Sequence, residues 1–138
     1  MASVGAALQL IQAHLAKTGW FTSVSIGEPD GPPTSGAAAV FLTGGSAASL
    51  SDTSFQRRRD ITVRIYIDVS TEPREKAETN LDTMVYDTET ALSGDLSLGS
   101  SDWVIAPGIE ITETFDYVDM GGRPFRTADL VLPLSYRA

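Results

Sequence analysis

The alternation of apolar and polar residues is clearest between Ile61 and Val69, where every second residue is β-branched and apolar. The residues that alternate with them are Thr62, Arg64, Tyr66 and Asp68. A period of two is typical of a strand that turns one face toward a core and the other toward polar surroundings. This segment therefore predicts a half-buried β-strand.

Two other segments space their apolar residues three and four positions apart, which is typical of amphipathic helices. The first runs from Val4 to Thr18, with Ser3 as N-cap and Gly19 as the residue that ends the helix. The second begins near Pro73, where a missing N–H needs no partner, and ends at Gly94. The apolar stripe of this second helix consists of Ala77, Leu81, Met84, Val85, Thr88 and Leu92.

Shorter apolar segments predict further strands between stretches rich in Gly, Pro, Ser and Asp. The expected strands are residues 23–28, 37–43, 103–118 and 125–134, with a bend at Pro107 and Gly108 and a hairpin turn at 119–123. In the 103–118 strand, Ile109, Ile111, Phe115 and Tyr117 share one face with Glu113. Residues 29–36 and 44–54 are expected to be loops, and the sequence leaves open whether they order only on assembly.

The expected order of elements is α-β-β-β-α-β-β. Runs of strands interrupted by one helix favour the α+β class, with a mainly antiparallel sheet and both helices packed on one face. The chain of 138 residues is long enough to bury a core of its own. We therefore expect residues 1–138 to form a single domain.

Composition narrows the possible functions. The net charge is −8, so free association with DNA would work against the field of the protein. The chain has no cysteine, which excludes disulfides and thiolate metal sites. Neither a secretory signal nor an apolar run of about 18 residues is visible, so we expect a protein that stays in the cytoplasm of the cell that makes it and does not enter a membrane.

Candidate chemistry is sparse. The single histidine, His14, lies beside the apolar stripe of the first helix and is expected to be a packing or surface residue. No nucleophile motif and no phosphate-binding loop accompany it. Glu110 and Glu113 could form an acid–base pair, but no sugar-binding aromatics surround them in the sequence. The sequence thus predicts no enzyme, no cofactor and no metal site, and leaves open only weak divalent-ion binding by the acidic second helix.

Three consecutive arginines, Arg57, Arg58 and Arg59, are unusual in so acidic a chain. A DNA-binding surface needs a broader basic patch, and the only lysines, Lys17 and Lys76, do not extend one. Two interpretations remain: a solvated strand end that pairs with nearby carboxylates, or a contact with the acidic helix of another copy in a ring or stack. The candidate interface residues are Arg57, Arg58, Arg59, Glu75, Glu78 and Asp82.

Several short segments occur in a recognisable order. They are H-L-A-K-T-G-W-F at 14–21, T-V-R-I-Y at 62–66, E-P at 72–73, S-G-D-L-S-L-G at 93–99 and Y-V-D-M-G-G-R-P-F-R at 117–126. In these segments the chain resembles the tail terminator (minor tail) proteins of long-tailed double-stranded DNA phages, especially phages of actinobacteria. The resemblance extends over nearly the whole chain.

The resemblance implies a small α+β subunit that assembles into a ring of six copies in the neck of the virion. Such a ring ends the growth of the tail tube and then joins the tube to head-completion proteins, while the genome passes through its hole without specific binding. It catalyses no reaction and is assembled in the host cytoplasm. Two alternatives stay open: a head-closure or tail-completion adaptor of the neck, and an acidic module that mimics DNA and inhibits a host enzyme.

Overall fold

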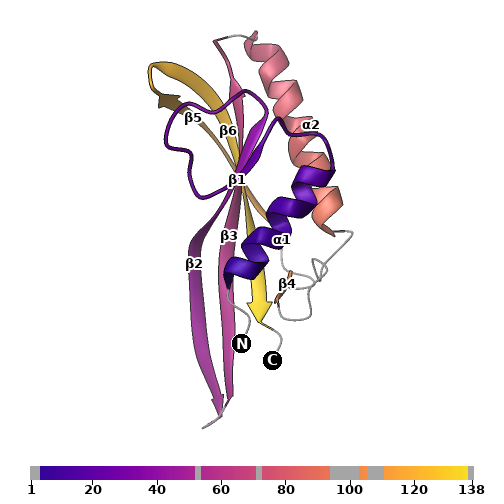
Figure 1. The fold of residues 1–138 in the computed structure, drawn as a ribbon, viewed down its shortest axis with the longest axis vertical. Coiled ribbons are helices and arrows are strands. Elements are labelled where there is room, and N and C mark those ends of the chain that lie inside the picture. The colour runs from indigo at the N-terminus through magenta and orange to yellow at the C-terminus, as the bar shows by residue number, and fades with distance from the viewer. Residues whose placement is uncertain (1–3, 52–53, 71–72, 94–102, 106–110, 137–138) are drawn as a thin grey trace.

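The structure, a computed structural model, describes residues 4–51, 54–70, 73–93, 103–105 and 111–136, and side chains within 7–45, 58–70, 73–92 and 111–135. Over these residues the chain forms two helices and six strands (Figure 1). They are α1 (Val4–Lys17), β1 (Val24–Ile26), β2 (Ala37–Ser51), β3 (Ser54–Asp68), α2 (Arg74–Ser93), β4 (Trp103–Ile105), β5 (Thr112–Met120) and β6 (Arg123–Tyr136).

All six strands belong to one sheet, and β3 is its central strand. From Arg58 to Tyr66, β3 is paired with β2 on one side and with β6 on the other, antiparallel in both cases. The short β1 lies parallel to β2, while β4 and β5 pair with different ends of β6. The expected α+β class with a mainly antiparallel sheet is confirmed.

Both helices cover one face of this sheet, which we call the helix face. The alternating residues of β3 from Ile61 to Ile67 are buried here, as the period-two pattern predicts. They pack against the apolar stripes of the two helices and against every second residue of β6. The buried cluster also contains Ile11, Leu15, Leu81, Val85, Leu92, Leu130, Leu132 and Leu134. The expectation that the two helices share one face of the sheet is confirmed.

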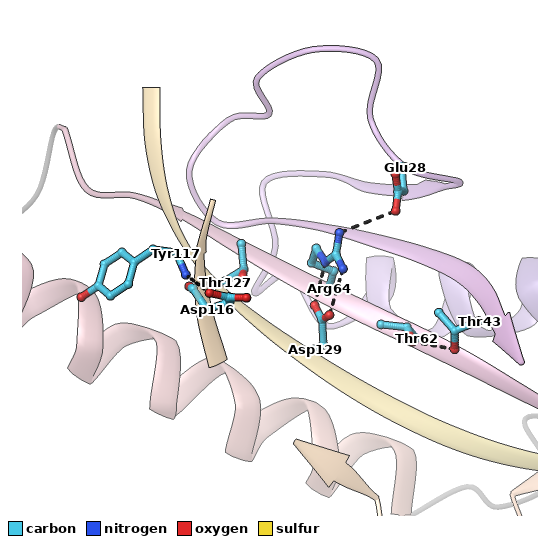
Figure 2. A network of polar contacts seen from close by, with 8 residues as sticks. All are labelled: Glu28, Thr43, Thr62, Arg64, Asp116, Tyr117, Thr127 and Asp129. Atoms are coloured by element: carbon cyan, nitrogen blue, oxygen red, sulfur yellow. Dashed lines mark hydrogen bonds and ion pairs between the residues drawn. The ribbon is translucent and has the colours of Figure 1, made fainter. Parts of the chain in front are cut away.

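The opposite face carries a smaller core of Ala39, Tyr66 and Phe125, in which the two rings meet edge to face at 6.1 Å between centroids. Residues 27–36 pass over this face, so we call the segment the bridging loop and the face the loop face (Figure 2). The loop is fixed by the N–H of Gly36, which donates to the Tyr66 carbonyl at 2.7 Å. The expected loop at 29–36 is confirmed, and this hydrogen bond anchors it to the sheet.

The hairpin turn expected at 119–123 connects β5 to β6. Gly121 and Gly122 have φ values of 60° and 80°, the left-handed conformation that a two-residue type I′ turn requires. A Cβ atom at Gly121 would lie 2.8 Å from Cγ of Pro32, so the bridging loop packs directly on this turn. Glycine is needed here for both its backbone conformation and its small size.

The expectation of a loop at residues 44–54 is wrong. β2 continues to Ser51 and β3 begins at Ser54, and the two strands pair from Gly44 opposite Asp60 to Ser51 opposite Ser54. We call residues 44–51 and 54–59 the arm; it runs past both helices at one end of the molecule (Figure 1). Glycine, serine and alanine have low strand propensity, so the sequence does not predict a strand here. The strand forms because β3 supplies its backbone hydrogen bonds.

The single strand expected at residues 103–118 is also wrong. β4 pairs with residues 134–136 of β6, whereas β5 pairs with residues 123–131. Phe115 and Tyr117, expected on one face of that strand together with Glu113, are 41 % and 54 % exposed because β5 is an edge strand. The bend expected at Pro107 and Gly108 lies outside the described residues.

The base of the arm allows a test of its packing. A Cβ atom at Gly45 would lie 2.8 Å from the carbonyl oxygen of Arg58, which belongs to the backbone of the paired strand. At Gly44 the nearest atom is Oδ2 of Asp60 at 3.2 Å, the movable end of a side chain. We expect Gly45→Ala to destabilise the protein by about 1–2 kcal/mol, and Gly44→Ala by less than about 0.5 kcal/mol.

Urea unfolding measures this difference, and hydrogen exchange at the arm amides should show that the loss begins in the arm. Equal stability of the two variants would contradict the close approach of β2 and β3 at Gly45.

Candidate interaction site

The predicted arginines lie at the base of the arm. The Arg58 side chain is 48 % exposed, and its Nε donates to Oδ1 of Asp60 at 3.1 Å. Nη1 of Arg59 donates to the Arg58 carbonyl at 2.9 Å, and its side chain lies against Gly45. Arg57 is paired through its backbone with Ala47, and its side chain lies outside the described part. The interpretation of a strand end that pairs with nearby carboxylates therefore holds for Arg58.

The predicted acidic residues lie on α2. Glu75, Glu78 and Asp82 are spaced three and four residues apart, and Glu89 continues the same row, so all four share one flank of the helix. This acidic flank points toward β5, because the Tyr117 hydroxyl donates to Oε1 of Glu78 at 3.3 Å. The arm lies at the opposite end of the molecule, so the structure does not bring the predicted arginines and carboxylates together within one chain (Figure 1).

Arg126 of β6 fills the space between α2 and β5. Its Nε donates to Oε1 of Glu78 at 2.6 Å, and its guanidinium lies 4.5 Å from the ring centroid of Tyr117 and 5.8 Å from that of Phe115. The hydrogen bond from Arg126 lowers the pKa of Glu78. Sequence reasoning did not select Arg126, although it occupies the same alternating face of β6 as Ala128 and Leu130.

A second acidic contact joins α2 to β5. Glu89 of α2 and Glu113 of β5 lie close enough for their carboxyl groups to interact. Partial burial of Glu89 and the closeness of Glu113 raise the pKa of Glu89 to about 7. Neither residue has a described ion pair with a base. Apart from the placement of Glu113 on the same face as Phe115, nothing in the sequence indicates this contact.

The loop face carries a polar network centred on Arg64 (Figure 2). Its Nε and Nη2 donate to the two carboxylate oxygens of Asp129 at 2.7 and 2.9 Å, and Nη1 lies 3.6 Å from Oε1 of Glu28 in the bridging loop. The guanidinium also lies 5.1 Å from the ring centroid of Phe41. The bond to Asp129 raises the pKa of Arg64, so this cation is permanent and neutralised within the chain.

Other charges on this face are neutralised in the same way. Asp68 is buried and accepts from the Ser70 N–H and hydroxyl at 2.9 and 2.5 Å, and Arg123 lies 3.8 Å away. The hydrogen bonds from Ser70 are the main reason why the pKa of Asp68 is lowered, and the charge of Arg123 adds to the effect. Of the arginines described on the loop face, Arg58, Arg64 and Arg123, each lies within ion-pair distance of a carboxylate.

A cavity of about 450 Å³ lies between the bridging loop and the sheet. Its ionisable lining residues are Glu28, Asp30 and Tyr66, and burial raises the pKa of the Tyr66 hydroxyl, which therefore stays protonated at neutral pH. The rest of the lining is serine, threonine, proline, glycine and small apolar side chains. Within the described lining no nucleophile stands beside a base, so the cavity gives no support to catalysis.

Three further expectations from the sequence concern His14, metal binding and membrane insertion. Nε2 of His14 lies 3.2 Å from the Ala91 carbonyl, so His14 joins α1 to α2, in agreement with a packing role. Among the described residues, no three potential metal ligands come together. No helix in the described part is long and apolar enough to cross a membrane.

Comparisons with known proteins identify no family for this chain. No protein-family model matches the chain, and no curated protein matches it. Among solved structures, a chain of the "Virion of native gene transfer agent (GTA) particle" is similar at 16 % sequence identity, with a TM-score of 0.47 over 93 % of this chain and 84 % of that chain.

The raised pKa of Glu89 predicts a pH dependence of stability. The folded protein retains a proton on Glu89 up to about pH 7, whereas the unfolded chain releases it near 4.5, so stability should fall as pH rises through this window. Because Glu89 is partly exposed, we expect a loss of about 1 kcal/mol. Glu89→Gln should remove this slope, as measured by urea unfolding from pH 4.5 to 8. An identical slope in both proteins would refute the raised pKa of Glu89.

The Arg126 contacts predict a second effect. Arg126→Ala removes the group that links Glu78 of α2 to the rings of Phe115 and Tyr117, so β5 should exchange its amide hydrogens faster. We expect a loss of about 1 kcal/mol in unfolding free energy, because Glu78 is half-exposed. Arg126→Lys keeps the charge but not the planar fork and should recover only part of this loss. Unchanged exchange at β5 would show that Arg126 does not hold the strand.

Proposed function

We propose that the chain is a structural subunit of a phage virion that assembles as a ring at the end of the tail tube, stops tube growth and forms the surface that joins tail to head. The observation that carries the proposal is the arm. From Ser54 to Arg57, β3 is described in pairing with β2, whereas its pairing with β6 begins at Arg58. An extension of this kind is suited to contacts with another molecule.

The chemistry of the chain agrees with a structural role. The described residues contain neither a metal cluster nor a nucleophile placed beside a base, and the most prominent polar groups are ion pairs that hold strands and helices together. This pattern is typical of a subunit whose task is assembly. The ordered sequence segments resemble those of tail terminators, and this resemblance is the reason for proposing a position at the end of the tail tube.

We assign the loop face to the hole of the ring. The charges on this face would allow the genome to pass. Arg64 and Arg123 on this face are held by Asp129 and Asp68, so they offer phosphates no uncompensated cation. Exposed carboxylates such as Asp116 and Glu28 leave the face negative. DNA would therefore slide past this surface without binding to it.

The test is tube assembly in vitro. The protein should be mixed with tail tube protein during polymerisation, and tube lengths should be measured by electron microscopy. We expect tubes of limited length that carry one ring of six copies at one end. Tubes of the same length distribution with and without the chain would overturn the proposal. Binding to a portal-side adaptor in place of tube subunits would favour a head-closure role.

A further inference from the structure

The surface between α2 and β5 is exposed, aromatic and acidic. It consists of Glu78, Asp82 and Glu89 from α2 and of Glu113, Phe115 and Tyr117 from β5, and we call it the α2–β5 surface. Phe115 and Tyr117 are among the exposed large side chains of the protein. Exposed aromatic residues of this kind are typical of the centres of protein interfaces.

One end of this surface already binds a guanidinium. Arg126 is held between the carboxylate of Glu78 and the rings of Phe115 and Tyr117, with a shortest hydrogen bond of 2.6 Å. The carboxylate supplies charge-assisted hydrogen bonds and the rings supply cation–π attraction. The geometry of the surface is therefore suited to arginine side chains, as its own chain demonstrates.

The other end offers the same groups with no described base. Glu113 and Asp82 both act electrostatically on Glu89, so three carboxyl groups lie near one another here. Phe115 lies between Glu113 and the position of Arg126 along β5. An incoming cation would relieve the repulsion among these carboxylates.

The arm has complementary properties. Residues 44–59 carry Arg57, Arg58 and Arg59 and the single acid Asp52, whereas β5 carries three acids and no base. Arg58 is well exposed. The partner strand in the arm consists mostly of glycine, alanine and serine, so little side-chain bulk would hinder close approach to another surface.

We propose that the arm of one copy docks on the α2–β5 surface of a second copy, with its arginines against Glu89, Glu113 and the exposed rings. Glu113 is level with Val63 of β3, whereas the arm begins at Arg59, so the two surfaces are separate within one chain and the proposed contact forms between copies. A contact between two different patches is heterologous and closes into a ring when the rotation between copies allows it. The proposal rests on the ring assembly proposed above and names the interface that builds it.

Disulfide trapping tests this contact without background, because the chain has no cysteine. Arg58→Cys on one copy is mixed with Phe115→Cys on another, and oxidation should give a mixed disulfide dimer. The matched control is Thr114→Cys, the neighbouring exposed residue, which points to the other side of the sheet. We expect about tenfold more dimer with Phe115→Cys than with Thr114→Cys. Equal yields would overturn the proposal.

Charge reversal gives an independent test in solution. The triple change Arg57→Glu, Arg58→Glu and Arg59→Glu should weaken self-association by about tenfold or more in sedimentation velocity, with an unchanged circular dichroism spectrum. A copy with Glu89→Arg and Glu113→Arg should show the same loss, and mixing the two variants should restore association. Association of the triple variant at the wild-type level would contradict the proposal.

The tube assay separates this inference from the proposed function. If wild-type protein and the triple variant both limit tube length, the arm contact is wrong and the function stands. If wild-type protein leaves tube length unchanged while Arg58→Cys and Phe115→Cys still cross-link, the contact stands and the function is wrong. If Phe115→Cys cross-links to tube protein and not to a second copy of the chain, the proposed partner of the α2–β5 surface is wrong.

Discussion

The fold depends on β3 being hydrogen-bonded on both sides. Because β2 and β6 pair with it from Arg58 to Tyr66, its side chains can point only to the helix face or the loop face. The residues at Ile61, Val63 and Ile65 therefore build the core, while Thr62, Arg64 and Tyr66 build the polar network and the smaller aromatic core. A shift of one residue in this register would exchange the two sets, which is why the alternation is so regular here.

Segments with a clear apolar periodicity were predicted correctly as helices or strands. The arm, which is rich in small residues and lacks this periodicity, was not predicted as a strand. The two helices and the central strand carry strong apolar periodicity, and their positions agree with the structure to within a few residues outside the arm. The arm has no such periodicity, because β2 consists mostly of glycine, alanine and serine there and is recognised only by its backbone pairing with β3. The sequence also did not show that β4 and β5 are separate strands, because they are distinguished by the different parts of β6 with which they pair.

The candidate site was predictable in its charges but not in its geometry. The sequence showed three arginines and an acidic helix, and it identified Glu75, Glu78 and Asp82 on that helix. It could not show that Glu78 is bound by Arg126, since those residues are joined only when the register of β6 brings Arg126 beneath α2. Glu89 and Glu113 were likewise separate in sequence and meet only because β5 runs along the acidic flank.

The open edge of the arm has a consequence for unwanted association. Beyond Val40, β2 has no described strand on its outer side, and an uncovered edge with small side chains is a template for uncontrolled sheet growth. Two arms that approached each other edge to edge would bring like charges together, since each carries Arg57, Arg58 and Arg59. The arginines thus act as gatekeepers that keep identical arms apart while leaving each arm able to meet a surface of opposite charge.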